Sequence, residues 1–123
     1  MGNVRFLYDN LITASSQITV SSASTGTITA SVKDSTAETP GSAILTLSGT
    51  YTGYEDIEYT IEVDSTSAGA TVGAATIKWS DGSSWNATGV VTTTGASTIS
   101  NGVSISFADS TMTFTAGDKW YFK

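Results

Sequence analysis

Apolar and polar side chains alternate along much of the chain, most clearly over residues 54–64. One face of this run carries Ile57, Tyr59, Ile61 and Val63, and the other carries Glu58, Thr60, Glu62 and Asp64. Successive side chains of a β-strand point to opposite faces. The period of two therefore predicts a strand with one buried face and one face in water.

The same alternation recurs in shorter runs. The predicted inward rows are Ile28, Ala30 and Val32; Ala43, Leu45 and Leu47; Ala75, Ile77 and Trp79; Ile99, Val103, Ile105 and Phe107; Met112 and Phe114; and the closing strand 118–122. Thr, Val, Ile and aromatic residues dominate these runs, which favours strands over helices. We expect one all-β domain with antiparallel strands, an Ig-like or jelly-roll-like sandwich. The pattern alone does not separate a sandwich from a barrel.

Turn residues fall between the predicted strands. Asp81-Gly82 lies between two Trp-bearing segments and predicts a primed hairpin turn, while Asn101-Gly102 fits either a turn or a bulge. Pro40-Gly41 and the stretches 94–96 and 116–118 indicate further turns or loops. Asp118 itself is expected to close its turn with its side chain.

The first 26 residues differ from the rest. They are rich in Ser, Thr and Ala with isolated apolar positions, and they predict either an arm that reaches a neighbouring subunit or an edge strand. The sandwich is then expected over 27–123. The candidate partner contacts are Arg5, Phe6, Tyr8, Ile18 and Val20 in this segment, together with Trp85.

The charge balance argues against two classes of partner. The net charge is −6 and only 13% of the residues are charged, while Ser and Thr make up roughly a third of the chain. Nucleic acid and anionic lipid both require clustered Lys and Arg, so we expect neither as a partner. Residues 1–10 lack the apolar run of a signal peptide, and we find no segment long and apolar enough to span a bilayer.

The residues for catalysis are scarce. The chain has no histidine and no cysteine, which removes the commonest general base and the thiolate ligands. Glu58 and Glu62 share one strand face but lie about 13 Å apart, too far for a glycosidase pair. The scattered Asp and Glu residues show no EF-hand spacing. We expect no enzyme activity, no cofactor and no metal site.

The three tryptophans allow two interpretations. They can form a sugar-stacking platform or pack in the core. Trp79 and Trp120 lie in apolar rows and are predicted to be buried. Trp85 follows the turn at 81–84 and is expected to be partly exposed.

From Leu47 onward the chain resembles a small β-domain of tailed-bacteriophage virion proteins, also found as insertions in flagellar hook-associated proteins. The residues that carry the resemblance are Ser48–Gly53, Tyr59–Val63, Gly73–Gly82, Ile99–Phe107 and Gly117–Phe122. The opening 4–16 is similar, more weakly, to the start of some phage structural proteins. These motifs are turn glycines and core aromatics, and no catalytic residue is carried over.

The resemblance implies a virion component, made in the host cytoplasm and docked on the particle as a capsid decoration protein or as a neck, tail or fibre accessory. Its partners would be other virion proteins, capsid or tail subunits, with this chain present as a homo-oligomer or in many copies. The alternative function is a carbohydrate- or host-surface-binding module, for which an exposed Trp85 or Tyr54 beside polar groups would be the sign.

Overall fold

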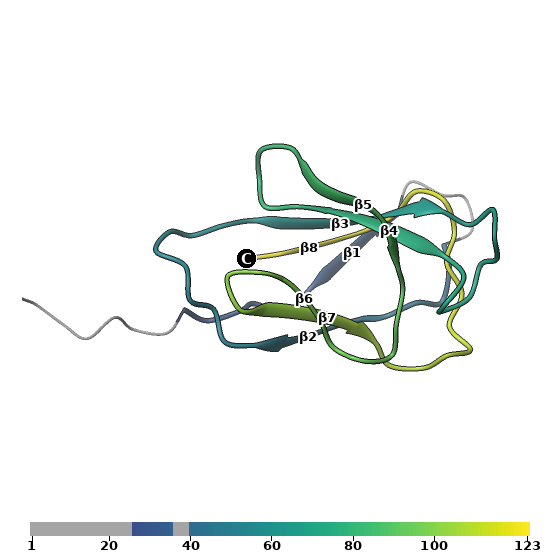
Figure 1. Cartoon of the computed structure of the whole chain (residues 1–123), viewed down its shortest axis with the longest axis horizontal. Helices are drawn as coiled ribbons and strands as arrows, with labels where there is room; N and C mark the ends of the chain where they lie inside the picture. Colours follow the sequence, from purple (N-terminus) through teal and green to yellow (C-terminus); the bar gives the residue numbers. More distant parts are fainter. Residues whose placement is uncertain (1–25, 36–39) are drawn as a thin grey trace, which may run out of the picture.

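The computed structural model describes residues 26–35 and 40–123, which form eight strands in two antiparallel sheets. The strands are β1 (Val32–Ser35), β2 (Leu45–Gly49), β3 (Tyr59–Ser65), β4 (Thr76–Ser80), β5 (Trp85–Val91), β6 (Ser97–Ser100), β7 (Val103–Phe107) and β8 (Asp118–Phe122). One sheet has the order β1-β8-β3-β4-β5 and the other β2-β7-β6. The predicted sandwich is confirmed, and Figure 1 shows its two layers edge-on.

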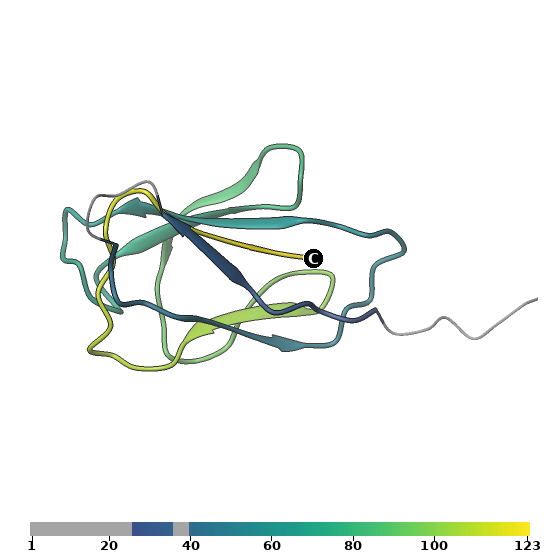
Figure 2. The same cartoon turned by 180° about the vertical axis from the view of Figure 1, so that it is seen from behind.

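The chain passes repeatedly between the two layers. It enters through β1, crosses to β2, and returns to form the meander β3-β4-β5. It then crosses again for the hairpin β6-β7 and returns as β8 between β1 and β3 (Figures 1 and 2). As a result, β1 and β5 are the edges of the larger sheet, and β2 and β6 are the edges of the smaller one.

The core lies between the layers and follows the predicted alternation. In β3, Tyr59, Ile61 and Val63 are buried while Thr60 and Glu62 are only half-buried. The other buried apolar residues are Ala43, Leu45, Ala75, Ile77, Trp79, Val103, Ile105, Phe107, Phe114, Trp120 and Phe122. The predicted inward positions Leu47, Ile57, Ile99 and Met112 are partly buried against this core. Burial of Trp79 and Trp120 is confirmed.

Aromatic rings fill the centre of the interface between the sheets. Phe107 meets Phe114 and Trp120 edge to face, with ring centroids 4.9 and 5.7 Å apart. Tyr59 stacks on Phe122 at 5.0 Å. Offset and edge-to-face pairs of this kind add to the free energy of simple burial. The Phe107–Trp120 pair joins β7 of the smaller sheet to β8 of the larger one. The Tyr59–Phe122 pair links β3 and β8, which are neighbours in the larger sheet.

The prediction for the first strand is wrong in its bounds and in which side chains point into the core. The strand covers Val32–Ser35, whereas the predicted inward row began at Ile28 and ended at Val32. Val32 is 65% exposed and Ala30 is exposed, whereas Ile28 is half-buried. The register pairs Lys33 with buried Trp120, so Lys33 takes the inward position.

Lys33 can face inward because its charge is satisfied there. Its Nζ donates to the carbonyl oxygens of Gly41 and Ala43 and lies 3.7 Å from Oδ2 of Asp118. The same ammonium group sits 5.2 Å above the ring of Trp120. The alkyl stem thus covers apolar surface while the charged end meets oxygen atoms.

Asp118 closes its turn as expected. Its side chain is fully buried, and Oδ2 accepts hydrogen bonds from the backbone N–H groups of Thr115 at 2.9 Å and Gly41 at 3.1 Å. These contacts tie the turn before β8 to the segment that leads into β2.

Two of the predicted turns can be compared with the hairpins in the structure. Asn101 and Gly102 both have positive φ, 48° and 76°, and join Ser100 to Val103 as a two-residue turn of the primed kind. The predicted primed turn at Asp81-Gly82 is instead a four-residue loop, because Ser80 pairs with Trp85. Asp81 of that loop exchanges hydrogen bonds with Asn86, the second residue of β5.

Candidate strand-docking groove along β2

The outer edge of β2 presents backbone groups that the sheet does not use. Phe107 donates its N–H to the carbonyl of Thr93, away from β2, so its pair with Leu45 is a non-hydrogen-bonded one. Such pairs alternate along an antiparallel ladder. Leu47 and Gly49, in register with Ile105 and Val103, therefore also direct their N–H and C=O groups out of the sheet.

A groove of about 760 Å³ runs along this edge, between β2 and residues 26–31. We call it the β2 groove. It is closed at one end by a bridge between Gly26 and Tyr51, and at the other by a 3.3 Å hydrogen bond from Ser31 Oγ to the Leu45 carbonyl. Among the described residues, no backbone hydrogen bond joins 27–31 to β2.

The far wall of the groove belongs to the other sheet. Thr29 and Lys123, just after β8, are joined by three hydrogen bonds of 2.8 to 3.1 Å. The β2 groove is thus the seam between the two layers on the side of the sandwich where β1 and β2 are the edge strands. A strand seated there would extend the smaller sheet.

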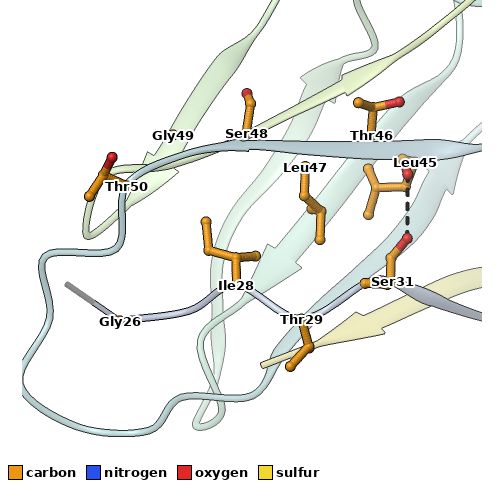
Figure 3. A pocket seen from close by; sticks show the side chains of 11 residues that line it. Gly26, Ile28, Thr29, Ser31, Leu45, Thr46, Leu47, Ser48, Gly49 and Thr50 are labelled. Atoms are coloured by element: carbon orange, nitrogen blue, oxygen red, sulfur yellow. Dashed lines mark hydrogen bonds between the residues drawn. The ribbon is translucent and has the colours of Figure 1, made fainter. Parts of the chain in front are cut away.

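The lining of the groove is apolar or hydroxylated. Ile28 and Leu47 point toward each other across it, while Thr46 and Ser48 point away (Figure 3). None of the residues that line it carries a charge. An uncharged extended segment can therefore enter without loss of charge hydration.

Elsewhere in the described part of the chain, every buried side-chain polar atom has a hydrogen-bond partner. The groove adds open main-chain donors and acceptors, those of Leu47 and Gly49 on β2. Main-chain hydrogen bonding is how an exposed sheet edge captures an added strand, with side-chain pockets setting its register.

A second, smaller hollow of about 270 Å³ adjoins the groove near Gly26 and Ile28 and is lined also by Tyr51 and Asp56. Tyr51 donates a hydrogen bond to the Glu55 carbonyl. Loss of hydration, the neighbouring Tyr59 and the Asp56 carboxylate raise the pKa of the Tyr51 phenol. The phenol is therefore neutral at physiological pH.

The structure places only one of the sequence-predicted contact residues. Arg5, Phe6, Tyr8, Ile18 and Val20 lie outside the described residues. Trp85 begins β5 and is 41% exposed, as expected, but it lies on the larger sheet and not in the β2 groove.

Sequence reasoning missed the groove itself. It marked Leu45 and Leu47 as core positions, which fits their side chains, but the groove is made by their backbone. Strand alternation carries no signal for which strand lies at an edge.

Over residues 26–35 and 40–123, no cluster of three or more acidic residues is placed to hold a metal ion. The same ranges contain no helix that is long and apolar enough to cross a bilayer.

No protein-family model, no curated protein and no solved structure matches the chain.

Proposed function

We propose that this protein is a non-enzymatic structural subunit of a tailed-phage virion, which docks on the particle as a capsid decoration protein or as a neck or tail accessory. The sequence resemblance supplies the setting. The single structural observation that supports a docking role is the β2 groove, an open sheet edge beside residues 26–31. Virion proteins are its partners in this proposal, and many copies of it share one particle.

The occupant that we propose for the groove is the segment 17–23 of a neighbouring copy. Residues 11–32 contain no charged side chain, which matches the uncharged lining. In an extended segment, Ile18 and Val20 fall on one face. That face would pack against Ile28 and Leu47 while the backbone pairs with β2.

The length of the preceding chain permits this exchange. The 25 residues before Gly26 span at most about 85 Å when extended, which exceeds the size of one small domain. In this proposal the added strand comes from a neighbouring copy, which a segment of this length can reach.

The test is made on purified particles of the phage that encodes this protein. Quantitative mass spectrometry should find a fixed copy number per particle, hundreds for a shell or tail-tube position and a dozen or fewer for a neck position. Deletion of residues 1–25 should abolish incorporation while the remaining domain still folds, as judged by its thermal unfolding.

Absence of the full-length protein from particles would overturn the virion proposal. Incorporation of the deletion variant at the normal copy number would leave the virion role standing and would overturn the role of the N-terminal segment.

A further inference from the structure

The outer face of the larger sheet carries a second feature, independent of the β2 groove. A hollow of about 400 Å³ lies over β3 and β8 and beside the β4–β5 hairpin. We call it the Trp85 hollow. It is lined by Thr60, Glu62, Ser80, Ser83, Ser84, Trp85, Lys119 and Tyr121. Its size is within the range of small-molecule sites in proteins.

The strand register builds this hollow from two rows of side chains. One row runs Tyr121, Thr60, Ser80 and Trp85, each paired with the next across neighbouring strands. The other row runs Asp34, Lys119, Glu62 and Lys78 in the same way. The first row is aromatic and hydroxylated, and the second alternates in charge.

The charges of the second row balance each other. Glu62 Oε1 is 3.5 Å from Lys78 Nζ, and Oε2 is 3.4 Å from Lys119 Nζ. Asp34 is the register partner of Lys119 on its other side. With two carboxylates for two ammonium groups, the site offers polar contacts without a net charge to attract an anion or a cation.

The indole of Trp85 is held at the side of the hollow. Lys78 Nζ lies 4.4 Å from the centroid of its ring, a cation–π contact. Lys78 is in turn paired with Glu62, so the ring is in contact with the charged row. Trp85 remains 41% exposed, so an aromatic surface meets the solvent.

Hydroxyl groups along the lining of the hollow are available to a ligand. Those of Thr60, Ser83, Ser84 and Tyr121 make no hydrogen bond to any other residue that the structure describes. Each hydroxyl can both donate and accept. An apolar aromatic surface on the same sheet face as such groups suits a molecule with an apolar C–H face and a hydroxyl edge.

We propose that the Trp85 hollow binds a neutral saccharide, with one pyranose ring packed on the indole of Trp85. The hydroxyl groups of the saccharide would hydrogen-bond to Thr60, Ser84 and Tyr121 and to the outer atoms of Glu62 and Lys119. The balanced charge row selects a neutral sugar over a uronic acid or a phosphorylated one. This proposal does not depend on the virion role, since it rests on a different sheet and different residues.

The experiment uses the full chain and the ¹H–¹⁵N spectrum of the three indole N–H groups. The probes are cello-oligosaccharides, malto-oligosaccharides, N-acetylglucosamine oligomers and galacto-oligosaccharides at millimolar concentration, with an oligogalacturonate as the anionic comparison. We expect at least one neutral probe to shift the Trp85 signal while the buried Trp79 and Trp120 signals stay in place. Oligogalacturonate should give no comparable shift.

Trp85→Ala should weaken binding by about tenfold or more, measured by calorimetry with the same probe. Trp85→Tyr should restore part of it, because a ring surface returns. The matched control is Tyr54→Ala, which removes a fully exposed aromatic outside the hollow and should leave the affinity within about twofold.

No shift of Trp85 with any neutral probe would overturn the proposal, as would unchanged affinity in Trp85→Ala. Salt-sensitive binding of oligogalacturonate alone would also overturn it, since that result would mean an anion site on the two lysines.

Discussion

The ammonium group of Lys33 holds one end of the sandwich together, since it meets the carboxylate of Asp118 and two backbone carbonyls at once. Lys33→Met keeps the aliphatic cover over Trp120 but removes the charge. Because Asp118 is fully buried, water does not replace the contact with Lys33 that its carboxylate loses. We expect the free energy of unfolding to fall by about 2–4 kcal/mol, less than a wholly buried pair because Lys33 is partly exposed. Urea denaturation measures it.

The control for this change is Lys123→Met. Lys123 pairs with Asp56 at 3.9 Å, and both side chains are well exposed. Such surface pairs contribute little, so the stability should change by less than about 1 kcal/mol. Equal losses in the two variants would contradict the role given to Lys33.

Asp109 gives a second prediction at the scale of one residue. Its Oδ1 accepts hydrogen bonds from the backbone N–H of Thr111 at 2.8 Å and from its hydroxyl at 2.9 Å, and these lower the pKa of Asp109. A folded-state pKa below the unfolded one means that ionised Asp109 stabilises the fold at higher pH. That contribution is lost as the pH falls through the folded pKa.

Thr111→Val removes one of the two donors. The pKa of Asp109 should rise toward its ordinary value without reaching it, because the backbone donor remains. An NMR titration of the side-chain carboxyl carbon measures this, and an unchanged titration would show that the hydroxyl has no part in the shift.

Inward apolar positions were the most predictable feature at this scale. In β3, β4 and β8 the alternation locates the buried side chains, because one face of each strand packs on the opposite sheet. It failed at β1, where Lys33 faces inward and Val32 outward. Burial of a lysine depends on a partner 85 positions later in the chain, and no local pattern records that partner.

At the scale of elements, the β6–β7 hairpin depends on its two-residue turn. Gly102 has a φ of 76°, and a Cβ there would lie 2.1 Å from the carbonyl oxygen of Thr50. Gly102→Ala should therefore lower the stability by about 1–3 kcal/mol and reduce the midpoint of thermal unfolding.

Gly95→Ala is the matched control. Gly95 lies in an exposed loop without positive φ, and its Cβ would meet only ordinary contacts, so stability should hold or rise slightly.

Turn positions were predictable from Gly and Asn, but turn lengths were less so. Asn101-Gly102 gave the two-residue turn because both residues adopt positive φ readily. Asp81-Gly82 gave a longer loop because the pairing of Ser80 with Trp85 leaves four residues between the strands. Loop length follows from the strand register, which the sequence near the turn does not determine.

At the scale of the whole molecule, topology decides which sites exist. The sequence predicted a sandwich and an exposed Trp85, yet the β2 groove and the Trp85 hollow both arise from strand order. The groove forms because β2 is an edge strand next to the seam, and the hollow forms because β3 lies between β4 and β8. Neither neighbour relation follows from alternation, because β8 pairs with β1 and β3, and β2 with β7, across long stretches of the chain.

The proposed strand addition makes a prediction about self-association of the purified protein. Thr46 and Ser48 are exposed on β2 and point away from the groove, so Thr46→Lys with Ser48→Lys should leave the fold intact. Lysines on an edge strand oppose pairing with another strand. We expect the pair to raise the dissociation constant of self-association by about tenfold or more, measured by analytical ultracentrifugation. Removal of residues 1–25 should give a monomer.

The control places two lysines on the exposed loop between β5 and β6, as Thr94→Lys with Ala96→Lys. The net charge changes by the same amount, from −6 to −4, so a general effect of charge on association would appear equally in both double variants. Because added positive charge on this acidic chain reduces mutual repulsion, the control should associate as well as the unmodified protein or slightly better. Weaker association in the β2 variant therefore has to come from the edge itself, whereas parallel behaviour of the two would rule out β2 as the place where copies meet.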